Sequence, residues 1–166
     1  MNTKLNSLKN KNNIIAITCI GIILITAACN NLNVYAKQKF FPVHEWKTGD
    51  SVQFSFDITD TIARYNVFIV LRHTDEYAFN NIWLNITSHP PQSAPSKQMF
   101  DLKLADNANG WLGTGMGDIF EHKIKINTAS LQLRKGNYTI SLEQIMRENP
   151  LKHLLNVGIR IEKIIP

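Results

Sequence analysis

Residues 51–58 have the sequence SVQFSFDI, in which polar and apolar side chains alternate from the first residue to the last. This period of two is typical of a β-strand with one buried face. Residues 66–72, NVFIVLR, follow shortly afterwards and are almost continuously apolar and rich in β-branched residues. That composition indicates a central strand of a sheet.

Strand patterns of these two kinds continue through the rest of the chain. Further strands are expected at residues 80–87, 100–104, 119–126, 137–144 and 157–164. Turn signals such as Pro90-Pro91 and Lys135-Gly136-Asn137 separate them. Residues 144–155 have some helical character, but Pro150 would break a helix there. The sequence therefore predicts an all-β fold, a single antiparallel β-sandwich (jelly-roll or immunoglobulin-like) of seven or eight strands.

The N-terminal 29 residues have a different pattern. Residues 1–13 are polar and carry three lysines and no acid, and residues 14–28 are apolar and end in small residues. A basic segment, a short apolar segment and small residues at a cleavage point are the features of a secretory signal peptide. Cys29 follows directly after Ile25-Thr-Ala-Ala28, an arrangement that resembles a bacterial lipobox. Such a cysteine receives fatty acyl chains such as palmitate and becomes the first residue of the mature chain.

Three alternatives compete with lipidation at Cys29. Thr26 stands where the common lipobox has Leu, so cleavage could instead follow Val34-Tyr-Ala36, or Cys19 could be the lipidated residue. The apolar run could also be a retained anchor, but its 15 residues fall short of the ~20 that span a bilayer. The expected organisation is a signal peptide at 1–28, a polar lipidated tether at 29–39 and a β-sandwich domain at 40–166.

Composition excludes several classes of function. Residues 1–28 hold three of the 18 basic residues and none of the 13 acidic ones, so the remaining chain carries a net charge of only +2. No basic stripe points to nucleic acid. The mature chain keeps one cysteine, so it cannot form an internal disulfide, and lipidation explains that cysteine better than redox chemistry.

The segment Gly110–Asp118, GWLGTGMGD, is the most conspicuous candidate site. It lacks the Lys-Ser/Thr pair of a phosphate-binding loop. Its glycines are expected to serve a connection that needs positive φ or close backbone approach. Alternatively, the segment is a ligand or partner surface with Trp111 as an aromatic platform and Asp118 beside it. The five histidines lack metal-site spacing and no serine lies in a nucleophile elbow. No catalytic, metal or cofactor site and no small-molecule substrate is therefore predicted.

Several short motifs, in order along the chain, resemble the gliding motility lipoprotein GldH family of the Bacteroidetes. Besides the lipobox at Cys29, they are Tyr65-Asn66 leading to Leu71-Arg72, Asn80–Leu84, Leu104–Asp106, Gly110–Gly115, Gly136–Tyr138, Gln144–Arg147 and Val157–Ile159. The resemblance implies a membrane-anchored lipoprotein with no known catalytic activity, which supports surface motility alongside the type IX secretion machinery. It carries over a role for one residue, Cys29, as the lipid attachment site. Family members also occur in non-motile species, so motility of the source organism does not follow.

The expected function is therefore that of a non-enzymatic lipoprotein, anchored in the outer membrane, that acts through protein partners of the cell envelope. Residues 30–39 contain no acid, which favours the periplasmic side. The alternative is a glycan-binding module, by analogy of fold, which needs Trp83 or Trp111 exposed beside a polar group such as Asn85 or Asp118. Asp60-Thr61-Ile62 resembles the O-glycosylation pattern of exported Bacteroidetes proteins, which makes Thr61 a candidate modification site.

Overall fold

The structure is a computed structural model and describes residues 33–164. Cys29, the signal peptide and the lipobox lie outside the described residues. The described part contains only strands, turns and loops, so the prediction of an all-β, antiparallel chain is confirmed. It contains no helix long and apolar enough to cross a membrane.

The first sheet is built around strand β4, which holds the apolar run at 66–72. The sheet order is β1-β14-β4-β10-β9, with β11 paired to β4, and every pair is antiparallel. The strands are β1 (Asn33–Phe40), β4 (Arg64–Thr74), β9 (Thr114–Met116), β10 (Ile119–Lys125), β11 (Leu131–Gln132) and β14 (Leu154–Ile164). The long strand β4 therefore lies in the interior of the sheet, as its composition predicts.

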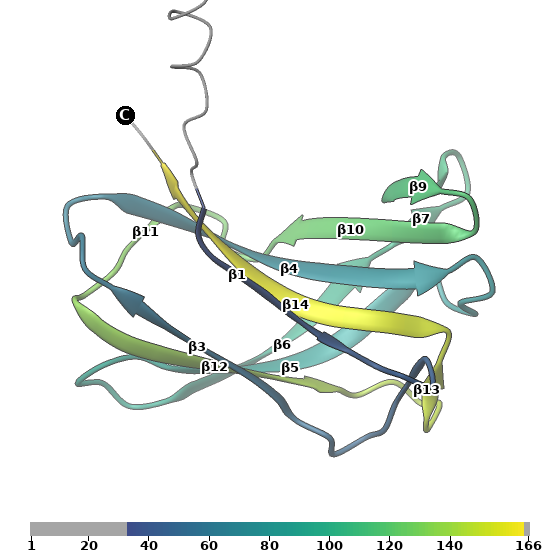
Figure 1. Ribbon diagram of the computed structural model, residues 1–166, viewed down its shortest axis with the longest axis horizontal. Coiled ribbons are helices and arrows are strands. Elements are labelled where there is room, and N and C mark those ends of the chain that lie inside the picture. The colour runs from purple at the N-terminus through teal and green to yellow at the C-terminus, as the bar shows by residue number, and fades with distance from the viewer. Residues whose placement is uncertain (1–32, 165–166) are drawn as a thin grey trace, which may run out of the picture. The chain divides into compact units, whose positions relative to one another are not determined.

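The second sheet has the order β3-β12-β5-β6 and is also antiparallel. Its strands are β3 (Val52–Ile58), β12 (Gly136–Gln144), β5 (Asn81–His89) and β6 (Ser96–Lys103). Two small pairs complete the described chain, β2 (Glu45–Trp46) with β13 (Leu151–Lys152), and β7 (Ala105–Asp106) with β8 (Gly110–Trp111). Figure 1 shows the two main sheets as layers, with β4 and β14 in one and β12 and β5 in the other.

The two sheets enclose one hydrophobic core. In β3, Val52, Phe54, Phe56 and Ile58 are buried and the residues between them are exposed, as the alternation predicts. Phe56 stacks on Tyr138 of the neighbouring strand β12, with ring centroids 5.5 Å apart. Burying each such side chain contributes about 1.5–3 kcal/mol.

The structure corrects the sequence prediction in one place. The sequence predicts a tether through residue 39, but residues 33–40 form β1, which pairs with β14 along its length. The sequence of residues 33–40 resembles a tether because β1 is an edge strand whose side chains are mostly exposed and polar. At residues 144–155, where Pro150 argues against a helix, the chain forms the end of β12, a loop, β13 and the start of β14. The described residues form fourteen strand segments, of which eight are seven or more residues long and five are two residues long.

Register defines two ends of the fold. At one, called the Asn33 end, Asn33 pairs with Glu162, and Arg64 lies between Ile164 and Gln132. At the other, the Thr74 end, Thr74 pairs with Ile119, which begins β10. The eleven residues of β4 rise ~3.3 Å each, so the two ends lie roughly 33 Å apart. In Figure 1, β1 begins and β14 finishes at the same end.

Candidate functional site

The Asn33 end is the part of the domain that lies nearest to Cys29 along the chain. Asn33 follows Cys29 by four residues. A fully extended chain spans at most ~3.5 Å per residue, so a group attached to Cys29 stays within about 14 Å of the first residue of β1. The length of the chain alone therefore keeps the Asn33 end within that distance of Cys29.

The loop between β3 and β4, residues 59–63, lies at this end. Its residue Ile62 has 89 % of its surface exposed, and Val34, Leu131 and Ile164 are exposed at the same end of the fold. Ile62 and Ile164 line a hollow of about 500 Å³ together with Asp60, Ala63, Arg64 and Lys163. An exposed isoleucine is unusual at a loop tip, which is normally polar.

Asp60 holds this loop in one conformation. Its Oδ1 accepts the backbone N–H groups of Ile62 and Ala63 at 2.9 and 3.1 Å, and its Oδ2 accepts from Lys163 Nζ at 2.6 Å. The hydrogen bond from Lys163, supported by the two backbone bonds, lowers the pKa of Asp60 to about 2. The hydroxyl of Tyr65 donates to the Asp60 carbonyl at 2.6 Å, so the loop is tied to β4 as well.

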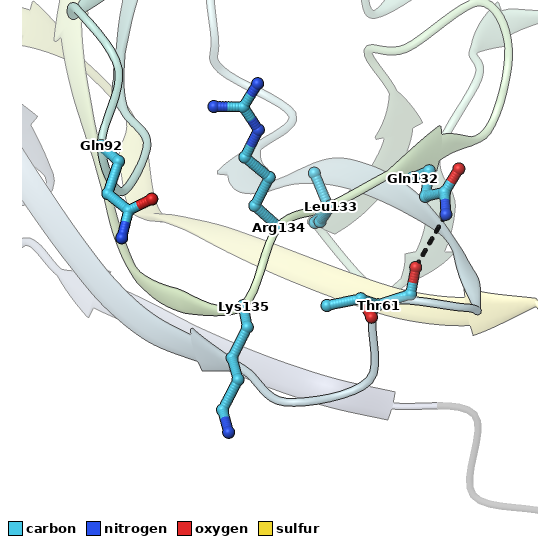
Figure 2. Close-up of a pocket in the computed structure, with 6 residues that line it drawn as sticks. All are labelled: Thr61, Gln92, Gln132, Leu133, Arg134 and Lys135. Atoms are coloured by element: carbon cyan, nitrogen blue, oxygen red, sulfur yellow. Dashed lines mark hydrogen bonds between the residues drawn. The ribbon is translucent and has the colours of Figure 1, made fainter.

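A second hollow, of about 690 Å³, adjoins the same loop and is shown in Figure 2. Gln132 Nε2 donates to the Thr61 carbonyl at 2.9 Å across it. Arg134 and Lys135 extend to opposite sides of the segment that leads into β12 (Figure 2). Both are exposed, as is Thr61, so the candidate glycosylation residue is accessible.

The Gly110–Asp118 segment lies at the Thr74 end. Gly113 and Gly117 meet the backbone requirements that the sequence predicts. A Cβ on Gly113 would come within 2.6 Å of the Glu121 carbonyl and 2.9 Å of the His122 ring. Gly117 has φ +66° in the turn between β9 and β10. Asp118 is exposed and its carbonyl accepts the Asp75 N–H at 2.8 Å, which joins this turn to the end of β4.

Trp111 is part of an aromatic cluster at this end. Its ring centroid lies 4.3 Å from that of His73, 5.8 Å from Phe120 and 6.3 Å from Tyr77. Trp111 and Trp83 are both partly buried. The rings around Trp111 leave it no free face as an aromatic platform, so Trp111 gives the glycan-binding alternative no support.

Two buried histidines complete the cluster and were not singled out by the sequence. His73 Nε2 and His122 Nε2 lie 2.9 Å apart, and His73 Nδ1 lies 2.6 Å from the Thr74 carbonyl. A carbonyl only accepts, so His73 carries its proton on Nδ1, and its Nε2 accepts from the Nε2–H of His122. Burial lowers the pKa of both imidazoles, and the nearby His73 lowers that of His122 further. Within residues 33–164, no third metal-binding side chain joins them into a metal site.

A family model described as GldH lipoprotein matches residues 33–161. The chain belongs to the GldH lipoprotein family. The match begins at the first residue of β1, in agreement with β1 being part of the folded domain. Lipoproteins are anchored in a membrane of the cell envelope, so membership implies that location for this chain.

Two relatives cover nearly the same span. A gliding motility lipoprotein GldH homolog of Christiangramia forsetii is 28 % identical over 151 residues, which are 87 % of this chain and 92 % of the relative. The gliding motility lipoprotein GldH of Flavobacterium johnsoniae is 27 % identical over 154 residues, 86 % of this chain and 95 % of the relative. A chain from the structure of infectious bursal disease virus Gx strain aligns over 78 % of this chain and 32 % of its own length, at 11 % identity and a TM-score of 0.27, too low to support an argument.

The predicted site residues of this GldH family member do not form one site. Thr61 lies at the Asn33 end, and Trp111 and Asp118 lie at the Thr74 end. Cys29, the residue to which the family resemblance gives a role, lies outside the described residues. His73 could have been found from the alternation of β4 alone, since it continues the inward series Val67, Ile69, Leu71.

Proposed function

We propose that this chain is a non-catalytic lipoprotein of the gliding motility apparatus, anchored through Cys29 in the outer membrane and facing the periplasm. Both relatives are named gliding motility lipoproteins, which supports the process. In this proposal, residues 1–28 are removed as a signal peptide, and a domain of the β-sandwich type acts through envelope proteins. The observation that carries the proposal is the start of the folded domain four residues after Cys29.

The position of β1 argues against the alternative cleavage after Ala36. Cleavage after Ala36 would remove the first half of β1, including Tyr35, whose ring lies 5.3 Å from that of Phe56 in the other sheet. Cleavage before Cys29 leaves β1 whole. Two or more acyl chains on that cysteine would give stable anchoring, whereas one alone holds a membrane only marginally.

The Thr74 end offers the surface for protein partners. Met116, the last residue of β9, has 80 % of its surface exposed, and Leu112 is exposed close to it in sequence. Asp118 adds a charge on the same segment. Exposed apolar side chains rimmed by polar groups are typical of interaction sites. This end lies away from Asn33, so an anchored domain leaves it accessible.

Fractionation of cells that carry single cysteine variants tests the anchor. Cys29→Ser is expected to move the protein out of the outer-membrane fraction and to abolish gliding in a motile host that lacks its own GldH. Cys19→Ser is the matched control and should retain both, because it lies in the removed signal peptide. A Cys29→Ser protein that stays in the membrane with full function would exclude the proposed mechanism.

Co-purification from detergent-solubilised envelopes tests the partner surface. The double variant Leu112→Asp/Met116→Asp is expected to lose envelope proteins that the wild type retains. Met99→Asp is the control, because Met99 is comparably exposed but lies on β6 of the second sheet. Equal loss with both variants would argue against the Gly110–Asp118 segment as the contact.

A further inference from the structure

We propose that the Asn33 end of the domain rests directly on the phospholipid surface, with Ile62 and Ile164 at the level of the headgroups. This contact would orient the domain so that the Thr74 end points away from the membrane. The inference rests on the proposed acylation of Cys29 and adds a second, non-covalent membrane contact to it. The occupant of this apolar surface is therefore a lipid bilayer.

The length of chain between Cys29 and Asn33 is the first argument. An acylated Cys29 sits at the membrane interface, and four residues cannot carry Asn33 more than about 14 Å from it. The headgroup layer is itself several ångströms thick. The start of β1 is thus confined to the neighbourhood of the headgroups, and the Asn33 end is confined with it.

The side chains at this end provide the second argument. Ile62 is the most exposed of the large apolar side chains in the described residues. It lines one hollow with Ile164, the last residue of β14, and Leu131 is exposed next to Gln132, which pairs with Arg64. Two strands and a loop therefore present apolar groups at the end that the chain length brings to the membrane.

Charge at the same end suits phospholipid headgroups. Arg64, Arg134 and Lys135 are exposed cations. The acid on the Ile62 loop, Asp60, is neutralised by Lys163 at 2.6 Å. The other acids nearby are Asp57, which accepts from Asn137, and Glu162, which is paired with Lys123 and Arg160. Exposed cations beside apolar side chains are the combination found in proteins that bind membrane surfaces.

The loop is also fixed before it meets a membrane. The bonds from Asp60 to the N–H groups of Ile62 and Ala63 hold the isoleucine outward. A preformed loop loses little conformational freedom on binding, so its apolar side chain contributes more to the contact.

Depth-dependent quenching on the full-length acylated protein tests this inference. Ile62→Cys and, as the matched control, Met116→Cys are labelled with an environment-sensitive fluorophore. In the mature chain the added cysteine is the only free thiol, because Cys29 is acylated and Cys19 has been removed. Each protein is reconstituted into phosphatidylethanolamine/phosphatidylglycerol vesicles containing lipids spin-labelled near the headgroup. The label at residue 62 should be blue-shifted and quenched several-fold more than the label at residue 116.

Flotation of the same samples tests the anchor at Cys29 separately from the membrane contact of Ile62. Protein that does not float with the vesicles would overturn the anchor and this inference together. Protein that floats but shows no preferential quenching at residue 62 would overturn the inference alone. A blue shift without lipid quenching would show that a second copy or another protein covers Ile62, and would also overturn it.

Discussion

His73 and His122 lie on the neighbouring strands β4 and β10, with their Nε2 atoms 2.9 Å apart. This distance leaves room for one proton between the two nitrogens. The Thr74 carbonyl fixes the proton of His73 on Nδ1. His122 therefore donates to His73, and both rings are neutral in this arrangement. A second proton on the facing nitrogens would set two N–H groups against each other inside the fold.

The first prediction concerns stability at low pH. Burial, with a smaller contribution from His73, lowers the pKa of His122 to about 4, against 6.5 in the unfolded chain. A depressed histidine pKa means that the unfolded chain binds more protons, so stability is fully present above pH 6.5 and is lost as the pH falls towards 4. At about 1.4 kcal/mol per pH unit, the free energy of unfolding should fall by about 3 kcal/mol between pH 7 and pH 4.

Denaturant unfolding of the detergent-solubilised protein at several pH values measures this loss. His122→Gln should flatten the dependence on pH, even if the variant is less stable at neutral pH. His89→Gln is the control, because His89 is exposed at the end of β5 and should leave the slope unchanged. A His122→Gln protein with the wild-type slope would assign the acid sensitivity to other groups.

The second prediction concerns Gly113, which packs against the same histidine. An added methyl would collide with the Glu121 carbonyl at 2.6 Å and with the His122 ring at 2.9 Å, and the carbonyl belongs to a paired strand that cannot move easily. Gly113→Ala should therefore destabilise the protein by about 1–3 kcal/mol. Thr114→Ala, at an exposed neighbouring position, should have little effect in the same unfolding measurement. Equal stability of the two variants would show that the segment shifts freely.

The third prediction tests whether residues 33–40 are a packed strand, β1, or an unpacked tether. The ring of Tyr35 packs against Phe56 of the opposite sheet, so Tyr35→Ala should lower the free energy of unfolding by about 1–3 kcal/mol. Lys39→Ala is the control, because Lys39 is an exposed residue of the same strand. In a tether, neither substitution would alter the unfolding midpoint.

β1 also shows how far the sequence alone could lead. The alternation in Val52–Ile58 and the apolar run in β4 are local signals, and both predict their strands correctly. β1 carries a weak local signal because it is stabilised by pairing with β14, more than 110 residues away in the chain. Polar edge strands of this kind are recognised by their partner and not by their own composition.

The surroundings of the candidate site residues could not be predicted from the sequence either, because their neighbours come from strands distant in the chain. The sequence allows Trp111 to be either an exposed platform or a core residue. Which of the two it is depends on its packing against His73 and Phe120, which come from other strands. The His73–His122 bond depends on the register of β4 with β10. The short distance from Cys29 to the fold became visible only when Asn33 was placed in a strand.

The fourth prediction concerns Thr61 and Ile62, neighbours on the loop that Asp60 holds. A sugar on Thr61 would be a bulky hydrophilic group next to the isoleucine that we place among the headgroups, so glycosylation of Thr61 and membrane contact by Ile62 exclude each other. We expect the mature protein to carry acyl chains on Cys29 and no sugar on Thr61. The intact mass of the purified protein, compared with that of Thr61→Ala, measures this directly. The two masses should differ only by the threonine-to-alanine change. A larger difference, equal to that change plus a glycan, would confirm the Asp60-Thr61-Ile62 motif as a modification site. It would also contradict the membrane contact of this loop.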